Sequence, residues 1–220
     1  MGVHAAPGRR VVRGAPVRVT IFDYGAGNLH SLAKALDVEG AEVSVVSNPA
    51  ESVKTDVLVL PGVGAFGAAV DRLAPGREAM RYAILAGLPT VGICLGMQLL
   101  FDESDEGGGS GLGIIPGRVT RLAARRVPQI GWNEVIATGD EALFRDAPLP
   151  IAYYANSFVC RPVTEESVIA WTTHEDDRFP AAVRMGATVG VQFHPEKSSS
   201  AGVEFLHAYL REASTKRGTR

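Results

Sequence analysis

A cysteine placed between two glycines is the residue of this chain best suited to nucleophilic chemistry. Residues 90–98 read TVGICLGMQ, with Gly92 and Gly96 each two positions from Cys94. Small neighbours let a strand and a helix approach closely, so this spacing predicts a buried strand, a sharp turn at the cysteine and the start of a helix. Free amides at a helix start favour a thiolate. Cys94 is therefore a candidate nucleophile, with a buried structural cysteine as the alternative.

A histidine suited to act as the base lies about a hundred residues downstream. Residues 189–198 read VGVQFHPEKS, an apolar strand that ends in His194, Pro195 and Glu196. A residue before proline is held toward extended geometry, so we expect His194 and Glu196 to point to the same side. The carboxylate can then orient the imidazole toward a sulfur, as in catalytic triads. An ordinary surface ion pair is the alternative.

A glycine-rich loop could supply the donors that acyl transfer needs. The sequence PGVGAFG at residues 61–67 follows a short apolar run. We assign the N–H of Leu95, just after the nucleophile, as one oxyanion donor, and the N–H of Val63 as the second, with Gly62 and Gly64 flanking it. An ordinary loop between strand and helix is the alternative, because proline and glycine are common in loops.

The elements that must position these segments alternate in the first half of the chain. With 220 residues, of which 46% are hydrophobic and 21% charged, the chain is long enough for one domain with a large core. Strand and helix patterns predict strands at 17–22, 42–46, 57–60 and 90–93 and helices at 29–39 and 77–86. This alternation indicates an α/β fold whose parallel sheet has helices on both faces and binds ligands beyond the carboxyl ends of its strands.

The second half is richer in β-strand signals. A glycine-rich connector at 107–113 precedes them, and residues 198–200 are expected to cap a last helix. Strands are predicted at 118–122, 151–155, 168–172, 181–185 and 188–192.

The two ends of the chain are polar and lie outside the predicted domain at 17–212. Residues 1–16 carry three arginines and lack the apolar segment of a secretory signal. We expect a disordered extension or a misplaced start codon, with a transit peptide as the alternative. Residues 213–220 are expected to form a polar tail.

Charge and cysteine content exclude several classes of function. A formal net charge of −2 gives no basic field for nucleic acid, and no apolar run reaches the roughly 20 residues that cross a bilayer. Cys94 and Cys160 are far apart in sequence, which indicates neither a disulfide framework nor a zinc site. We expect no metal, a structural role for Cys160, and a cytoplasmic location, whose reducing conditions suit a thiolate.

The three chemical segments, in this order, resemble the triad (class I) glutamine amidotransferases from about residue 17 to 210. Residues 19–32 (VTIFDYGAGNLHSL), together with PGVG at 61–64, GWN at 131–133 and FHPEKS at 193–198, are similar to glutaminase subunits of imidazole glycerol phosphate synthase. The resemblance implies a single-domain, flavodoxin-like fold whose sheet is mostly parallel in its centre.

The resemblance also implies an activity and a partner. L-Glutamine would be hydrolysed, without a cofactor, through a γ-glutamyl thioester on Cys94. The ammonia would pass, within a heterodimer, to a (βα)₈-barrel cyclase subunit that makes imidazole glycerol phosphate and aminoimidazole carboxamide ribotide in histidine biosynthesis. The residues that match the family's glutamine-binding positions are Gln98, Glu106 and the backbone of Ser157 and Phe158.

Some positions depart from the family pattern or face the expected partner. Asn156 and Gln129 stand where related chains often have histidine, and an amide cannot change charge near neutral pH. By resemblance, Trp132 and Tyr153 would lie toward the subunit interface, where large aromatic side chains often serve as anchors. Plain core or rim packing is their alternative.

Three other functions remain open at this point. The chain could serve another triad amidotransferase, in anthranilate or pyridoxal phosphate synthesis, or be a non-catalytic binding protein on the same fold. Gly25 and Gly27 also suggest a dinucleotide-binding loop, but His30 stands where that motif has its third glycine.

Overall fold

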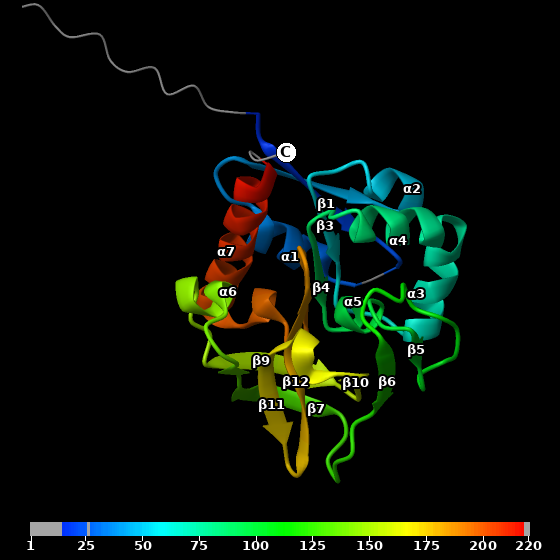
Figure 1. Cartoon of the computed structure of the whole chain (residues 1–220), viewed down its shortest axis with the longest axis vertical. Helices are drawn as coiled ribbons and strands as arrows, with labels where there is room; N and C mark the ends of the chain where they lie inside the picture. The colour runs from blue at the N-terminus through cyan, green and yellow to red at the C-terminus, as the bar shows by residue number, and fades with distance from the viewer. Residues whose placement is uncertain (1–14, 26, 218–220) are drawn as a thin grey trace, which may run out of the picture.

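An eight-stranded sheet forms the centre of the molecule (Figure 1). The computed structural model describes residues 15–25 and 27–217. In spatial order the strands are β2 (Ala41–Val46), β1 (Val17–Phe22), β3 (Val57–Leu60), β4 (Thr90–Ile93), β13 (Thr188–Val191), β12 (Asp177–Met185), β11 (Val168–His174) and β8 (Ile136–Ala137). The first five are parallel and the last three add antiparallel, which confirms the fold class predicted from the sequence.

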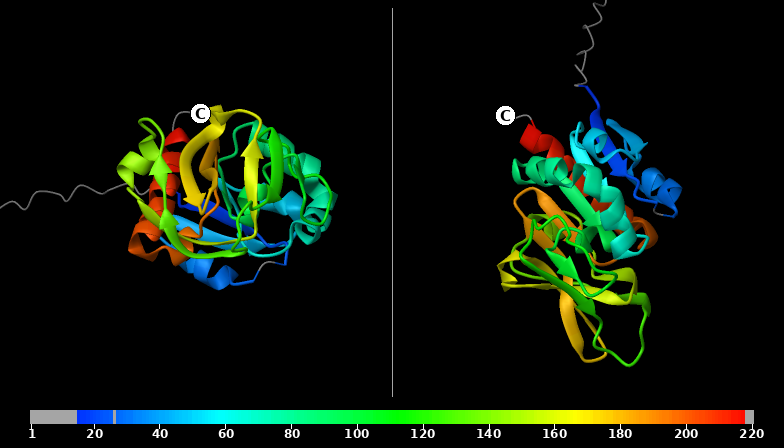
Figure 2. Two further views of the ribbon diagram at one scale, coloured as in Figure 1. Left: turned by 90° about the horizontal axis from the view of Figure 1, so that it is seen from below. Right: turned by 90° about the vertical axis from the view of Figure 1, so that its right-hand side faces the viewer.

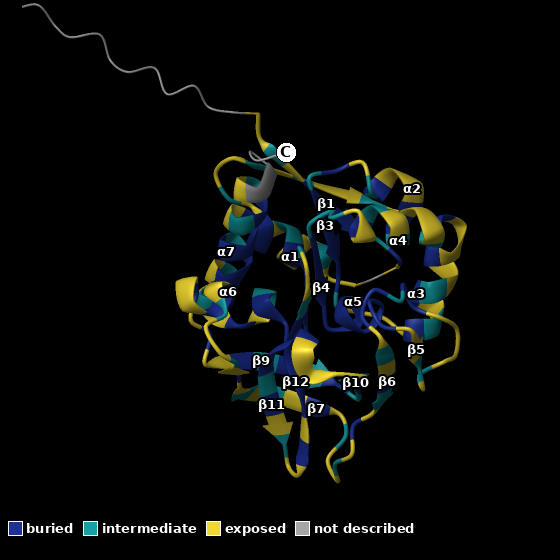
Figure 3. Cartoon of the chain, viewed as in Figure 1, coloured by how far each residue is buried: buried dark blue, intermediate teal, exposed yellow. Residues whose placement is uncertain are grey.

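Helices cover both faces of the parallel strands. Val57 and Val59 of β3 lie in the core shared with α1 (Leu29–Leu36) and α7 (Ser199–Arg217). Leu58 and Leu60, which point the other way, lie in the core shared with α3 (Phe66–Leu73) and α4 (Arg77–Leu85). Because side chains alternate along a strand, a fully apolar strand requires apolar cover on both faces, and Figure 3 shows these central strands as buried.

Smaller elements complete the fold. The right-hand view of Figure 2 shows the helices around one end of the molecule and the strands of the second half at the other. Two further sheets pair β10 (Phe158–Pro162), β6 (Gly117–Arg121) and β5 (Glu103–Ser104), and β7 (Gln129–Glu134) with β9 (Ile151–Asn156). The short helices are α2 (Pro49–Ser52), α5 (Leu95–Gln98), α6 (Ala142–Asp146), and the 3-10 helices η1 (Ala74–Gly76), η2 (Glu165–Ser167) and η3 (Pro195–Lys197).

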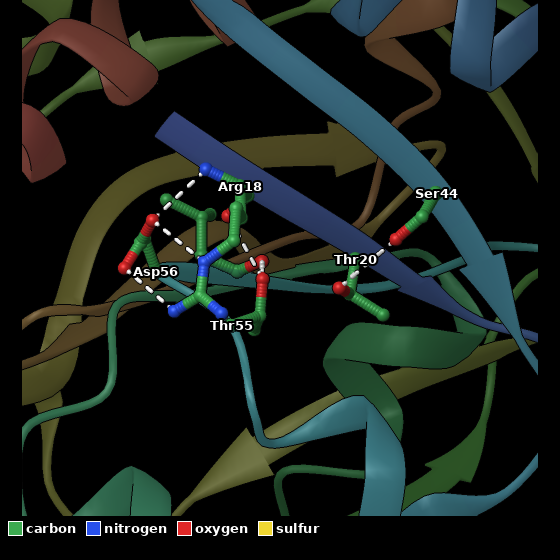
Figure 4. A network of polar contacts seen from close by, with 6 residues as sticks. Arg18, Thr20, Ser44, Thr55 and Asp56 are labelled. Atoms are coloured by element: carbon green, nitrogen blue, oxygen red, sulfur yellow. Dashed lines mark hydrogen bonds and ion pairs between the residues drawn. The ribbon is translucent and has the colours of Figure 1, made fainter. Parts of the chain in front are cut away.

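Polar contacts fasten the start of β1 to its neighbours (Figure 4). Asp56 accepts hydrogen bonds from the backbone N–H of Arg18 at 2.9 Å and from its guanidinium at 3.2 and 3.3 Å. The Thr55 hydroxyl donates to the Arg18 carbonyl at 2.8 Å, and the hydroxyls of Thr20 and Ser44 lie 3.2 Å apart between β1 and β2. These bonds help fix the register that brings the carboxyl ends of β1 and β3 level.

Several element boundaries differ from the sequence-based expectations. The first helix ends at Leu36, short of residue 39, and β7 was not predicted, since its sequence QIGWNE has a polar face and a glycine. The last helix continues to Arg217, and Ala213 is buried, so residues 213–217 of the expected tail extend α7. The expected extension at residues 1–16 falls almost wholly outside the described residues.

Candidate active site

The nucleophile candidate lies at a sharp turn between β4 and the single-turn helix α5. Cys94 has φ 47° and ψ −102°, outside the usual regions for a non-glycine residue, and its exposed fraction is 5%. A Cβ on Gly96 would lie 2.0 Å from the Leu60 carbonyl oxygen, and one on Gly92 would lie 2.5 Å from the Gly96 carbonyl oxygen. Both glycines are therefore required for strand and helix to meet at the cysteine.

The histidine and glutamate candidates form a pair beside this cysteine. Nδ1 of His194 lies 2.9 Å from Oε1 of Glu196, and the imidazole also hydrogen-bonds to the Cys94 side chain. His194 and Glu196 thus lie on the same side, as expected, but Pro195 starts a 3-10 turn, Pro195–Lys197, that was not predicted. His194 itself is extended, and the turn brings the carboxylate back to the ring.

The electrostatic setting favours a protonated imidazole. Burial lowers the pKa of His194, but hydrogen bonds with Cys94 and Glu196 outweigh it and raise that pKa from 6.5 to about 9. A protonated imidazole beside sulfur is the partner that a thiolate requires.

Backbone hydrogen bonds join the histidine to strand β9. The His194 N–H donates to the Tyr153 carbonyl at 2.8 Å, and the Tyr153 N–H donates to the Ser198 hydroxyl at 2.9 Å. That hydroxyl donates in turn to the His194 carbonyl at 2.7 Å. Ser198, expected to cap the last helix with its side chain, instead uses it to fix the histidine against β9.

A pocket of about 290 Å³ opens at these side chains, close to the lower end of the range of about 300–1,000 Å³ for ligand pockets. It lies at the carboxyl ends of β3 and β4 and under the connection from β9 to β10. All of the candidate catalytic, oxyanion and substrate residues except Glu196 line it, together with three others. Its lining residues are Gly62, Val63, Gly64, Cys94, Leu95, Gln98, Glu106, Ala155, Asn156, Ser157, Phe158, His194 and Lys197.

The expected substrate residues are held by specific contacts. Gln98 donates from Nε2 to the Phe158 carbonyl at 3.1 Å, and Asn156 donates from Nδ2 to the same oxygen at 3.3 Å. A Glu106 carboxylate oxygen accepts the N–H of Phe66, the first residue of α3, at 3.2 Å. Three segments far apart in sequence thus meet at the pocket wall.

The two amides that depart from the family pattern are neighbours. Gln129 of β7 pairs directly with Asn156 of β9, and both are buried. Oδ1 of Asn156 and both amide atoms of Gln129 have no hydrogen-bond partner among the described residues. Asn156, which lines the pocket, therefore has an unused acceptor close to the site.

The loop expected to hold the second oxyanion donor is far more exposed to solvent than Cys94. Val63 has an exposed fraction of 36%, and Gly64 is exposed too. A Cβ on Gly62 would lie 2.8 Å from Cε1 of His194, so the loop passes directly over the imidazole. Behind the loop, the buried hydroxyl of Tyr24 donates to the Pro61 carbonyl, and burial raises the pKa of that phenol well above its usual value.

An exposed apolar face lies next to the pocket on the β7–β9 sheet. Trp132 and Tyr153 are cross-strand partners whose rings meet edge to face at 6.2 Å, and Trp132 is 55% exposed. Ile130 and Ile151 are exposed on the same two strands. Ile130 pairs with Ala155, which lines the pocket, so the face continues to the pocket rim.

Within residues 15–25 and 27–217, no three His, Cys, Asp or Glu side chains are grouped so as to hold a metal ion. Every helix in the same described part of the chain is too short or too polar to span a bilayer.

Comparison with known proteins identifies the family. Residues 20–212 match the model of the family "Glutamine amidotransferase class-I". The chain is 45% identical to the imidazole glycerol phosphate synthase subunit HisH of Symbiobacterium thermophilum, over 86% of this chain and 91% of that relative. It is 40% identical to the subunit of the same name from Corynebacterium diphtheriae, over 88% and 98%. The chain belongs to the HisH family of class I glutamine amidotransferases.

Solved structures agree with this fold. A crystal structure of a glutamine amidotransferase superposes with a TM-score of 0.69 at 20% identity, covering 89% of this chain and 98% of that one. PurLQS from Thermotoga maritima superposes with a TM-score of 0.68 at 19% identity, covering 90% and 99%. The amidotransferase match includes Gly25 and Gly27, so these two glycines belong to the amidotransferase domain and not to a separate dinucleotide-binding module.

Sequence reasoning missed three residues around the HisH-family site. Lys197 lines the pocket, Tyr24 holds the Pro61 carbonyl, and Gln192 contacts the Cys94 sulfur. Only Gln192 carried a visible signal, since a glutamine interrupts an otherwise apolar strand pattern.

Proposed function

We propose that this chain hydrolyses glutamine at Cys94 and delivers the ammonia to a cyclase subunit, as part of imidazole glycerol phosphate synthesis in histidine biosynthesis. One observation carries the chemistry. Cys94 lies buried on a strained turn at the pocket, and His194 lines the same pocket and forms hydrogen bonds with both Cys94 and Glu196. That arrangement is the one that nucleophilic acyl transfer uses.

In the first half-reaction, His194 takes the thiol proton and the thiolate attacks the side-chain carbonyl carbon of glutamine. A carbon–sulfur bond forms and the carbonyl oxygen becomes an oxyanion. The imidazolium gives its proton to the amide nitrogen, the carbon–nitrogen bond breaks, and ammonia leaves the γ-glutamyl thioester. Glu196, bonded to Nδ1 at 2.9 Å, keeps the other ring nitrogen available for these transfers.

In the second half-reaction, His194 takes a proton from water, which attacks the thioester carbonyl carbon. The carbon–sulfur bond breaks, sulfur leaves as a thiolate, and glutamate is released. The thiolate regains its proton from the imidazolium, so the chain returns to its starting state without a cofactor. The same histidine acts as base and acid in both halves.

The oxyanion of both steps is stabilised by two backbone donors. One is the N–H of Leu95, the first residue of α5, because the first amides of a helix have no acceptor within the helix itself. The second is the N–H of Val63, whose peptide must be turned toward the pocket. Loss of one such donor costs about 10² to 10³ in rate, so the orientation of that peptide can switch hydrolysis on and off.

Glutamine is held at its charged end by side chains on the pocket wall. Glu106 keeps one carboxylate oxygen for the α-ammonium while the other accepts the Phe66 N–H at 3.2 Å. Gln98, fixed by its bond to the Phe158 carbonyl, and the backbone of Ser157 and Phe158 bound the opposite side.

The cyclase docks on the exposed apolar face of the β7–β9 sheet. Trp132 and Tyr153, an edge-to-face amphipathic pair, are its anchors, and exposed isoleucines lie on the same two strands. Backbone bonds connect Tyr153 to His194, so docking acts directly on the catalytic wall. That the face reaches the pocket rim supports transfer of the released ammonia directly to the partner. The heterodimer would work in the cytoplasm.

A glutaminase assay with and without the cyclase subunit and its ribonucleotide ligand tests the proposal. We expect little hydrolysis by the isolated chain, strong stimulation by the ligand-loaded partner, and none with Cys94→Ala. Hydrolysis that needs no partner would contradict the coupling, and activity that survives Cys94→Ala would contradict the chemistry. Stimulation by an anthranilate synthase subunit instead would favour another triad amidotransferase.

A further inference from the structure

A buried glutamine contacts the nucleophile from outside the triad. Nε2 of Gln192 lies 3.4 Å from Sγ of Cys94 and donates a hydrogen bond to it. Gln192 immediately follows β13, its own N–H donates to the Ala181 carbonyl at 2.9 Å, and its exposed fraction is 0%. Two residues later the chain reaches His194, so one segment supplies two contacts to the same sulfur.

The chemistry of this contact is restricted by the amide. A primary amide nitrogen can donate but not accept, and a donor binds a thiolate more strongly than a thiol. Burial of an amide is unfavourable unless its atoms are bonded, and Oε1 of Gln192 has no partner among the described residues. The bond to sulfur is therefore the main polar contact of this side chain within the described structure.

Ionisable groups also surround the sulfur. Tyr24, Cys160 and His194 all interact electrostatically with Cys94. Burial raises the pKa of Tyr24 and of Cys160 well above their ordinary values, so these two remain protonated and neutral. His194 carries the positive charge, but it must release and regain its proton in every cycle. Gln192 is a donor that does not titrate.

We propose that Gln192 is a positioning residue for the nucleophile, which holds the Cys94 sulfur and stabilises it as a thiolate while His194 moves protons. This inference rests on the proposed role of Cys94 and adds a fourth side chain to the site. Because the donor stays in place when the imidazole loses its proton, it acts in both half-reactions, each of which generates or consumes a thiolate.

The test is the pH dependence of Cys94 alkylation by iodoacetamide, measured on the full chain with Cys160→Ala as the background. Gln192→Met keeps an unbranched side chain of similar length and removes the donor. We expect the pH of half-maximal alkylation to rise by about one unit or more, as for loss of a hydrogen bond to a charged group. In the complex with the cyclase, kcat for glutamine hydrolysis should fall about 10- to 100-fold with KM nearly unchanged.

Two further variants keep the test decisive. Gln192→Asn withdraws the amide from the sulfur by one methylene, and its alkylation profile should shift in the same direction even if Gln192→Met does not fold. Thr90 lies on β4, the strand next to β13, and its buried hydroxyl donates to the Leu88 carbonyl and not to the sulfur. Thr90→Val removes this hydroxyl. It should lose stability but leave the alkylation profile unchanged.

Opposite results would overturn the inference. An unchanged alkylation profile in folded Gln192→Met would make Gln192 a packing residue only. A shift to lower pH would mean that the amide oxygen, and not the nitrogen, faces the sulfur. The alkylation assay needs no turnover, so it tests the role of Gln192 independently of the proposed function. The proposed function is tested separately, by glutamine hydrolysis in Cys94→Ala.

Discussion

The two walls of the pocket are built in different ways. The nucleophile wall is formed by Cys94 and His194, and Gln192 contacts its sulfur. These three side chains are 0–5% exposed, and each is hydrogen-bonded to another group. The loop wall, residues 62–65, is open to solvent, with Val63 36% exposed. The comparison shows that the nucleophile is held by contacts that the loop lacks. We propose that chemistry lies in the nucleophile wall, and that control lies in the loop wall, where a partner moves the oxyanion donor.

The largest effect is expected from removal of the sulfur. Cys94→Ala should reduce glutamine hydrolysis by about 10⁴-fold or more, because the thioester cannot form. The variant keeps the Cβ and loses little packing, so its thermal unfolding should stay close to that of the unsubstituted chain. A folded variant that retains substantial hydrolysis would remove the nucleophile wall from the mechanism.

Neutralisation of the glutamate should give the next largest effect. Glu196→Gln keeps a hydrogen-bond acceptor for His194 but removes the charge, so hydrolysis should fall about 10²- to 10⁴-fold. The pKa of His194, raised to about 9, should fall, and the alkaline limit of activity should move to lower pH. A pH–rate profile identical to that of the unsubstituted chain would contradict this assignment.

The same histidine gives a stability test. The pKa of His194 is higher in the folded protein, about 9, than in the unfolded chain, 6.5. Protonation of His194 therefore stabilises the fold fully at pH values below 6.5, and this stabilisation is lost as the pH rises through about 9. Urea unfolding should therefore show less stability at pH 9.5 than at pH 6.5. The difference should shrink in Glu196→Gln, and an equal difference in both proteins would exclude the ion pair as its source.

A methyl group between the two walls should have an intermediate effect. An added Cβ at Gly62 would lie 2.8 Å from Cε1 of His194 and 3.1 Å from the Ile93 carbonyl oxygen, so loop or imidazole must move. Gly62→Ala should lower kcat/KM about 10- to 100-fold. Gly27→Ala is the matched control, because its Cβ would meet only Cγ1 of Val63 at 3.9 Å. Equal losses in both variants would argue against a close contact between the walls.

The smallest effect on hydrolysis is expected from a change at Tyr24, which lies behind the loop wall. Tyr24→Phe removes the hydroxyl that donates to the buried Pro61 carbonyl, which should cost about 1 kcal/mol of stability. With Pro61 released, the Gly62–Val63 peptide should turn more easily, and hydrolysis without the partner should rise a few-fold. Unchanged basal hydrolysis, despite the lost stability, would show that Pro61 does not restrain the donor.

Sequence predicted the local parts of this site and, through the family resemblance, the meeting of Cys94 with His194, but it missed other long-range contacts. The elbow at Cys94 follows from glycines two positions away, and the strand ends follow from apolar runs, so both are local. The contact between Gln192 and Cys94 joins residues 98 positions apart, and no spacing rule reports it. The bond from Tyr24 to Pro61 is missed for the same reason. The pairing of His194 with Glu196 was foreseen, but the 3-10 turn that makes it was not.

The most direct test of the central claim is mass spectrometry of the chain quenched in acid during glutamine turnover with the ligand-loaded cyclase. The account predicts one γ-glutamyl group on the peptide that contains Cys94, absent in Cys94→Ala and more abundant when water attack is slowed. Sustained hydrolysis with no adduct on that peptide, or with the adduct on Cys160, would contradict it.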